Sequence, residues 1–417
     1  MNSFEKYRQL KSQFDFTYKG VHLNRVLVLN LWSLANGQFK LSWKEHALAL
    51  LTVDVSKINL PLGEQTILST FGRYNRKDHL EIYQTVLNKL NGQASYNNTT
   101  EWTYKLTIHP RAIIKTYSYI KKKLSKSSLS LKDKLGLAVL CIHYCNTLEE
   151  LQKINLSNVK KYLCQCSVLN LENLFTQFMK QRRIPTYSLQ EGIYFIFKMN
   201  PPLDAIQYEN FETDHLLCWG QFSIDEYSSY GISINRLLLA GYPKNIELQT
   251  LKDDNQYQKC MILLARDSFR ETNNTLLKIL STLSSHYTFC LKLHPSCDYN
   301  YYSDFASLHQ MSIIDKGKTI NECLNKEEYD FCIAVNTTAY YESLMRGLPC
   351  LRFWDKTFDL TVGCIYDVFS TEKDFLESIK ILKNKTHNEY QSEINKMLNY
   401  AIGIKCDNYR KILCDSQ

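Results

Sequence analysis

A chain of 417 residues is longer than one ordinary hydrophobic core supports, so two domains are expected. Its apolar fraction of 44% and charged fraction of 22% are ordinary for a folded protein, which excludes a disordered or low-complexity chain. The opening residues are charged and lack the apolar core of a signal peptide, and the strongest apolar stretch, residues 135–142, is too short for a membrane span. We therefore expect a cytoplasmic protein whose 14 cysteines are reduced thiols.

The net charge of +8 is modest, and much of it lies in residues 115–126 (KTYSYIKKKLSK). Lysines interleaved with tyrosines and isoleucine fit a face that rests on anionic lipid, which would make the protein peripheral at the inner face of the plasma membrane. The alternative is a solvated helix face. Because no nucleic-acid motif accompanies the charge, no nucleic-acid partner is expected.

The first third of the chain mixes predicted strands and helices. Residues 25–31 (RVLVLNL) and 65–70 (QTILST) are typical of buried strands, and residues 77–90 are typical of a helix. Arg73 lies in the loop between the second strand and this helix, and we expect it on the acceptor side of a site. Residues 126–158 are predicted to form a helical insertion.

From residue 161 onward, predicted strands and helices alternate in two series. In the first series the expected strands are 161–169, 184–189, 215–220 and 236–240, and the expected helices are 171–182 and 223–230. In the second series the strands are 259–265, 289–293, 312–314, 331–335 and 349–353, and the helices are 272–284 and 339–346. Alternation of this kind predicts parallel sheets with helices on both faces.

The polar residues 244–257 lack periodicity and are predicted to link the two series, and residues 371–412 are mainly helical. The expected fold class is therefore α/β, with two Rossmann-like domains, residues 1–245 and 246–417, facing each other across a cleft. Ligands of such folds bind at the carboxyl ends of the strands.

The first candidate for chemistry is Glu191, in the sequence Leu-Gln-Glu-Gly that follows the predicted strand 184–189. A carboxylate at this position, followed by Gly192, can point into the cleft and accept the proton of an acceptor hydroxyl. We expect Gly192 to line the acceptor side. The alternative is a plain turn, in which Gly192 supplies a positive φ and Glu191 faces water.

The second candidate is His294, in the sequence Lys-Leu-His-Pro-Ser. Pro295 ends the preceding strand and favours an extended backbone at His294, whose ring can donate to a nucleotide phosphate next to Ser296. A lone histidine in a turn is the alternative. Arg266 and Ser268, just after the first strand of the second series, either contact the nucleotide or form an ordinary polar loop.

The third candidate is the sequence Val-Asn-Thr-Thr-Ala, in which Asn336, Thr337 and Thr338 precede a predicted helix that carries Glu342. Hydroxyls and unpaired amides at a helix start suit a phosphate. Simple N-capping is the alternative, and it is compatible with phosphate binding. Glu342 either binds donor hydroxyls or reaches back as a cap.

Taken together, an acidic-Gly motif, a His-Pro pair and a Thr pair before a helix resemble the bacterial GT-B sialyltransferases and polysialyltransferases. Related capsule transferases and CDP-glycerol-type polymerases share the last two elements. Residues 186–244 are similar to a stretch of capsular and cell-wall polysaccharide proteins, with the markers Cys218-Trp219-Gly220-Gln221, Tyr230-Gly231-Ile232 and Ala240-Gly241-Tyr242-Pro243. By this resemblance Glu191 is the general base, His294 holds the donor phosphate, and Thr337 and Thr338 assist. Sialyltransferases usually carry a second acid where this chain has Gln190.

The resemblance implies a GT-B fold and an inverting, metal-independent transfer from a nucleotide-activated donor, with a CMP-linked sugar favoured. The acceptor would be an oligosaccharide or lipid-linked molecule of surface polysaccharide synthesis. No cofactor or metal is expected, because Asp-X-Asp, Walker A and Gly-X-Gly-X-X-Gly motifs are absent and the Cys141, His143 and Cys145 cluster lacks a second ligand pair. Two alternatives stay open: a phosphotransferase using CDP-glycerol or CDP-ribitol, and a GT-B-shaped partner subunit without catalysis.

Overall fold

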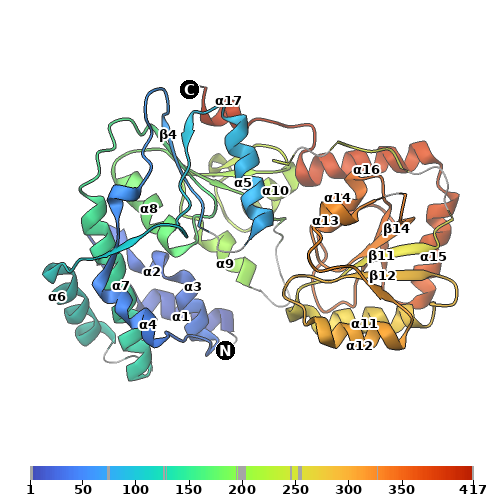
Figure 1. The fold of residues 1–417 in the computed structure, drawn as a ribbon, viewed down its shortest axis with the longest axis horizontal. Helices are drawn as coiled ribbons and strands as arrows, with labels where there is room; N and C mark the ends of the chain where they lie inside the picture. Colours follow the sequence, from blue (N-terminus) through green and yellow to red (C-terminus); the bar gives the residue numbers. More distant parts are fainter. Residues whose placement is uncertain are drawn as a thin grey trace.

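Two parallel six-stranded sheets form the cores of two α/β domains in the computed structural model (Figure 1). The structure describes residues 3–72, 76–124, 127, 129–193, 195, 203–244, 247–251, 256–325 and 327–415. The predicted pair of Rossmann-like domains is confirmed. None of the helices within these ranges combines the length and the apolar character needed to cross a bilayer.

The first sheet has the strand order β10-β9-β8-β7-β4-β5. Its strands are β4 (Ile67–Thr70), β5 (Ala94–Ser95), β7 (Lys161–Cys164), β8 (Thr186–Leu189), β9 (His215–Cys218) and β10 (Leu237–Leu239). The helices of this domain include α1 (Ser3–Gln13), α5 (Lys77–Lys89), α6 (Pro110–Tyr119), α7 (Leu131–Leu151), α8 (Asn170–Gln181), α9 (Leu203–Asn210) and α10 (Gln221–Ser229). Strands β4 and β8 are buried along their whole length, as expected for parallel strands covered on both faces.

Residues 25–31 are helical, so the predicted strand there is wrong. They belong to α2 (Leu23–Val26) and α3 (Val28–Ala35), and α3 packs against α1. The buried residues Leu23, Val26, Leu27 and Leu31 are spaced like one face of a helix. A short apolar run is compatible with a buried helix and with a buried strand, so the sequence pattern alone does not distinguish the two.

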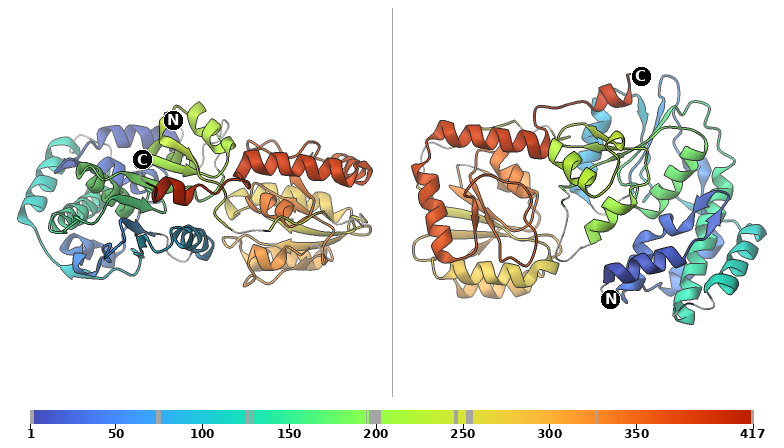
Figure 2. Two further views of the ribbon diagram at one scale, coloured as in Figure 1. Left: turned by 90° about the horizontal axis from the view of Figure 1, so that it is seen from above. Right: turned by 180° about the vertical axis from the view of Figure 1, so that it is seen from behind.

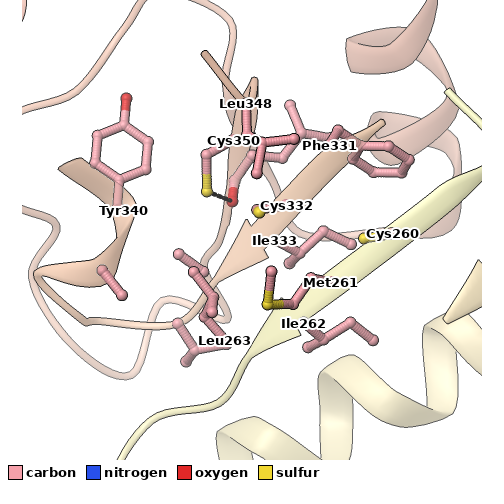
Figure 3. Packing of buried hydrophobic residues seen from close by; sticks show 14 of the residues in the cluster. Cys260, Met261, Ile262, Leu263, Phe331, Cys332, Ile333, Tyr340, Leu348 and Cys350 are labelled. Atoms are coloured by element: carbon pink, nitrogen blue, oxygen red, sulfur yellow. Dashed lines mark hydrogen bonds between the residues drawn. The ribbon is translucent and has the colours of Figure 1, made fainter. Parts of the chain in front are cut away.

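The second sheet has the strand order β13-β12-β11-β14-β15-β16. Its strands are β11 (Lys259–Leu263), β12 (Thr288–Lys292), β13 (Ser312–Ile313), β14 (Phe331–Ala334), β15 (Cys350–Phe353) and β16 (Val368–Phe369). The main helices are α11 (Arg270–Ser281), α12 (Tyr299–Leu308), α14 (Ala339–Met345), α15 (Glu372–Asn384) and α16 (His387–Ile402). Figure 3 shows Cys260, Cys332 and Cys350 among apolar side chains at its centre, where burial raises the pKa of each thiol.

The chain returns to the first domain at its end, because α17 (Tyr409–Leu413) packs on that domain (Figure 1). Tyr409 joins the apolar cluster of β4 and donates to the carbonyl of Gly241 at 2.8 Å. The crossing is close: a side chain at Gly220 would overlap the backbone of α16, and one at Gly241 would overlap Cys406. Residues 409–413 thus share the first domain's core, although the expected boundary grouped them with the second domain.

Candidate active site

Glu191 lies two residues after the end of β8, and its carboxylate is buried rather than exposed to water. The residue is 8% exposed. Its Oε2 accepts a hydrogen bond of 2.6 Å from Gln165 Nε2 and lies 3.2 Å from His79 Nδ1. Gly192 does not adopt a positive φ. Both observations contradict the plain-turn alternative, in which Gly192 would supply the turn and Glu191 would face water.

His79, near the start of α5, holds the Glu191 carboxylate as a donor. Arg76 Nη2 lies 2.6 Å from His79 Nε2, and a guanidinium can only donate, so Nε2 is the acceptor. Gln165 Nε2 also lies 3.1 Å from Nδ1, but it donates to Glu191 at the shorter distance of 2.6 Å. We therefore assign the ring hydrogen to Nδ1, which points it at Glu191. Arg76 is itself fixed by two bonds to Asp78, of 2.9 and 2.7 Å. Although burial opposes it, the hydrogen bonds from Arg76 hold the pKa of Asp78 at about 2.

Gln165, directly after β7, links Glu191 to a second buried carboxyl group. Its backbone N–H donates to Glu172 Oε1 at 3.1 Å, and the hydroxyl of Thr70, at the end of β4, donates to the same oxygen at 2.9 Å. The Cys166 N–H donates to Glu172 Oε2 at 3.0 Å. Burial raises the pKa of Glu172 to about 8 against these hydrogen bonds, and the charge of Glu191 adds to the rise. Three adjacent strand ends thus build one polar cluster.

Gln190, which stands where sialyltransferases carry an acid, has a structural role of its own. Its Oε1 accepts the Trp219 N–H at 2.8 Å, and its Nε2 donates to the Gly192 carbonyl at 2.8 Å. An amide makes both bonds, whereas a carboxylate can only accept. The side chain therefore ties the Glu191–Gly192 turn to the end of β9.

His294 follows β12 in the second domain and is neutral at physiological pH. Its Nδ1 accepts the Ser296 N–H at 3.1 Å and lies 2.8 Å from Ser296 Oγ, so Nε2 carries the hydrogen. Burial, with the positive charges of Arg266 and Arg76 nearby, lowers the pKa of His294 to about 4. The positive charge of Arg76, which is bonded to His79 of the first domain, therefore acts on His294 of the second.

The loops around His294 are joined to each other and more exposed than the Glu191 cluster. The Asp267 N–H donates to Ser296 Oγ at 3.1 Å, which connects the loop after β11 to the loop after β12. Arg266 and Ser268 flank this bond, and both are exposed, as is Pro295. Four predicted donor-site residues are therefore exposed in the loops next to His294: Arg266, Ser268, Pro295 and Ser296.

The Thr pair begins α14, a helix of only seven residues. Asn336 has a φ of +40°, and Thr337 Oγ1 accepts the Ala339 N–H at 3.3 Å, so capping is part of its role. Thr338 makes no side-chain cap and is half-buried. Glu342 Oε1 accepts from the Tyr242 hydroxyl at 3.0 Å.

Glu342 also belongs to an ion bridge between the domains. Lys244 Nζ lies 3.5 Å from Glu342 and 3.1 Å from Glu81 of α5. Ile82 of α5 packs into the apolar core of the second domain. Helix α5 thus contacts both domains through its side chains, and Figure 1 shows it on the side of the first domain that is turned toward the second. Arg73, predicted on the acceptor side, lies outside the described residues.

Similarity to solved structures supports this architecture. The chain is similar to the UDP-GlcNAc 2-epimerase of Methanocaldococcus jannaschii in complex with UDP-GlcNAc and UDP, with a TM-score of 0.50 and 13% identity over 84% of this chain and 98% of that one. The wall teichoic acid polymerase TagF gives 0.42 and 14% over 93% and 94%. The lipopolysaccharide outer core galactosyltransferase WaaB gives 0.48 and 11% over 83% and 97%. The chain has a GT-B-like fold. At such identities the likeness concerns the fold, and no family model and no curated protein sequence matches the chain.

Within this GT-B-like fold, the residues missed from the sequence are His79, Gln165, Glu172 and Arg76. Each lies within nine residues of the end of β4 or β7. These strands are neighbours in the sheet, but they come from segments far apart in the chain. The available signal was position near a helix start, because His79 and Glu172 stand in the first turns of the two predicted helices. The predicted strand 161–169 placed Gln165 inside a strand, whereas β7 ends at Cys164.

The cluster of Cys141, His143 and Cys145 on α7 has a structural explanation. Both cysteines are fully buried, and His143 Nδ1 lies 2.9 Å from the Leu51 carbonyl and 3.2 Å from the Leu48 carbonyl. His143 therefore ties α7 to the segment before and within β3 (Leu51–Val53). Among the residues described, no group of three or more His, Cys, Asp or Glu side chains is arranged to hold a metal ion.

Proposed function

We propose that this protein is a glycosyltransferase that moves a sugar from a nucleotide-activated donor to a growing surface polysaccharide or glycolipid, with inversion at the anomeric carbon. The observation that supports it is the buried Glu191 carboxylate, which is oriented by His79 and Gln165. Its partner His79 lies on α5, whose Ile82 packs into the apolar core of the second domain.

In this reaction the acceptor hydroxyl oxygen attacks the anomeric carbon as Glu191 takes the hydroxyl proton. The bond from that carbon to the phosphate oxygen breaks, and its electron pair stays on the leaving nucleotide. His79 and Gln165 both hold Oε2, so they fix the plane of the carboxyl group during proton transfer. Gly192 and Arg73 would line the acceptor side.

The donor phosphate would lie against the second domain. His294 Nε2–H is a neutral donor, and Arg266 supplies a positive charge beside it. The hydroxyls of Ser296, Thr337 and Thr338 would add hydrogen bonds to the charge that develops on the leaving phosphate. Pro295, Ser268, Asn336 and Glu342 would border this donor site.

Among donors we favour a CMP-linked sugar, as the resemblance to sialyltransferases implies, and no cofactor or metal is part of the proposal. A CDP-glycerol or CDP-ribitol phosphotransferase would use the same donor residues. The acceptor would be an oligosaccharide or lipid-linked molecule. We do not favour a partner subunit without catalysis, because Gln190 both accepts and donates a hydrogen bond and a second acid could not do both.

The test is thermal stabilisation by CMP, CDP, UDP and GDP, measured for the wild type, His294→Ala and the control His286→Ala. His286 is exposed and precedes β12, at the opposite end of the strand from His294. We expect stabilisation by a cytidine nucleotide that disappears only in His294→Ala. Stabilisation by UDP or GDP would overturn the cytidine preference, and no stabilisation by any nucleotide would contradict the proposed function.

A further inference from the structure

The positive charge of the chain is concentrated in one stretch, residues 102–132. This stretch holds eight Lys and Arg and no Asp or Glu, while the chain has 50 basic and 42 acidic residues. The rest of the chain therefore carries 42 of each sign and is balanced. A protein whose whole excess charge lies in one segment presents a local field rather than a uniform one.

Within this stretch, α6 and the π-helical turn after it (Ile120–Leu124) expose a mixed apolar and basic face. Ile114 and Tyr117 are each 67% exposed, and with Lys121 they are spaced three and four residues apart, on one side of the helix. Ala112 and Thr116, on the other side, are fully buried. Figures 1 and 2 show α6 at the end of the first domain that is farthest from the second.

The segments on either side of α6 add further exposed apolar side chains. Among the described residues, seven of the 18 large hydrophobic residues that are exposed lie between 104 and 135: Tyr104, Leu106, Ile108, Ile114, Tyr117, Leu131 and Leu135. Strand β6 (Tyr104–Leu106) precedes α6 in the chain, and α7 packs against α6. We call the exposed side chains of residues 104–135 the α6 face. So many in one region mark a contact surface.

Part of the basic charge is used within the fold, and part is not. Lys105 forms an ion pair with Glu150 at 2.8 Å, and Lys115 lies over the ring of Tyr18. His109, which precedes Pro110, also lies 3.0 Å from Glu150 and anchors the start of α6. Lys121, Lys122 and Lys123 are exposed and have no ion-pair partner among the described residues.

We infer that the α6 face docks on an anionic lipid bilayer. Its apolar side chains would enter the boundary between headgroups and acyl chains, and Lys121–Lys123 would meet the negative headgroups. A second copy of the chain that presented the same face would be repelled by the same positive charge. A nucleic acid would use the lysines but not Ile114 or Leu131. The inference is independent of the proposed chemistry.

The test is flotation of the full chain with vesicles of phosphatidylcholine, alone or with phosphatidylglycerol, at low and high salt. Two variants remove one component each: Ile114→Ser with Tyr117→Ser, and Lys121→Ser with Lys122→Ser and Lys123→Ser. The matched controls are Leu308→Ser, at a residue 76% exposed, and the triple change of the exposed Lys373, Lys380 and Lys383 to Ser on α15.

We expect the wild type to float with the anionic vesicles and each α6 variant to lose at least about tenfold in binding, while the controls are unchanged. No flotation of the wild type would overturn the inference. Loss in the lysine variant alone would also overturn it, because it would show attraction by charge without entry of Ile114 and Tyr117 into the bilayer. Stabilisation by a nucleotide, retained in every variant, separates this result from failure of the proposed function.

Discussion

The two halves of the candidate site are built differently. On the first domain, Glu191 belongs to a buried network in which Gln165, Glu172 and His79 join the ends of three adjacent strands. On the second domain, His294 stands among loops whose Arg266 and Ser296 are exposed. Under the proposed function, the side that accepts the proton is held by buried hydrogen bonds before any ligand binds, whereas the exposed phosphate side would be completed by its ligand. Changes in the first half should therefore cost stability or turnover, and changes in the second should cost binding.

The largest effect is expected from Glu191→Gln. Loss of a general base typically slows a reaction by about 10²–10⁴-fold, so turnover should fall by this factor. Nucleotide binding should persist, because the donor residues lie in the other domain. Initial rates with the donor identified by thermal stabilisation provide the measurement. Glu64→Gln, at an exposed residue before β4, is the control, and equal rates in the two variants would remove Glu191 from the mechanism.

Glu172→Ala should mainly destabilise the fold. It leaves the buried N–H groups of Gln165 and Cys166 without an acceptor, at roughly 1–3 kcal/mol for each group. Chemical denaturation should show a loss of roughly 2–6 kcal/mol in the free energy of unfolding. Glu271→Ala changes an exposed glutamate in the first turn of α11 and should cost almost nothing. Similar losses in both variants would contradict the rigid first half.

Gln190→Glu would restore the two-acid pattern of sialyltransferases but should lower stability. A carboxylate cannot donate to the Gly192 carbonyl, so one buried bond is lost, at a cost of roughly 1–3 kcal/mol. Gln190→Ala should lose the bond to the Trp219 N–H as well and be less stable still. Faster transfer by Gln190→Glu would show that the resemblance extends further than the structure indicates.

The effect that is smallest at neutral pH concerns the titration of His294. An unfolded histidine has a pKa near 6.5, whereas His294 in the folded protein has a pKa of about 4. Between these values the unfolded state binds the extra proton, so His294 makes the free energy of unfolding fall as pH falls from about 6.5 to 4. His294→Ala should reduce this slope and leave stability near pH 7.5 almost unchanged. A slope identical to that of the wild type would show that folding does not change the pKa of His294.

The sequence was most informative where strands and helices alternate, from residue 161 onward. Glu191 and His294 could be found because each lies within two residues of the end of a predicted strand. The partners of Glu191 could not be found in this way, because His79 and Gln165 are far from it in the chain and meet it only through the order of strands in the sheet. The apolar run at residues 25–31 failed for another reason: burial without alternation suits helix and strand alike.

The return of α17 to the first domain has a consequence for synthesis. Tyr409 and Leu413 complete an apolar cluster whose other members begin at Ile67. A ribosome releases the chain from its amino end, so this cluster stays open until the second domain has been made. The first domain therefore cannot finish folding before the second domain has been synthesised. A premature stop codon before Tyr409 would therefore damage the domain that was made first.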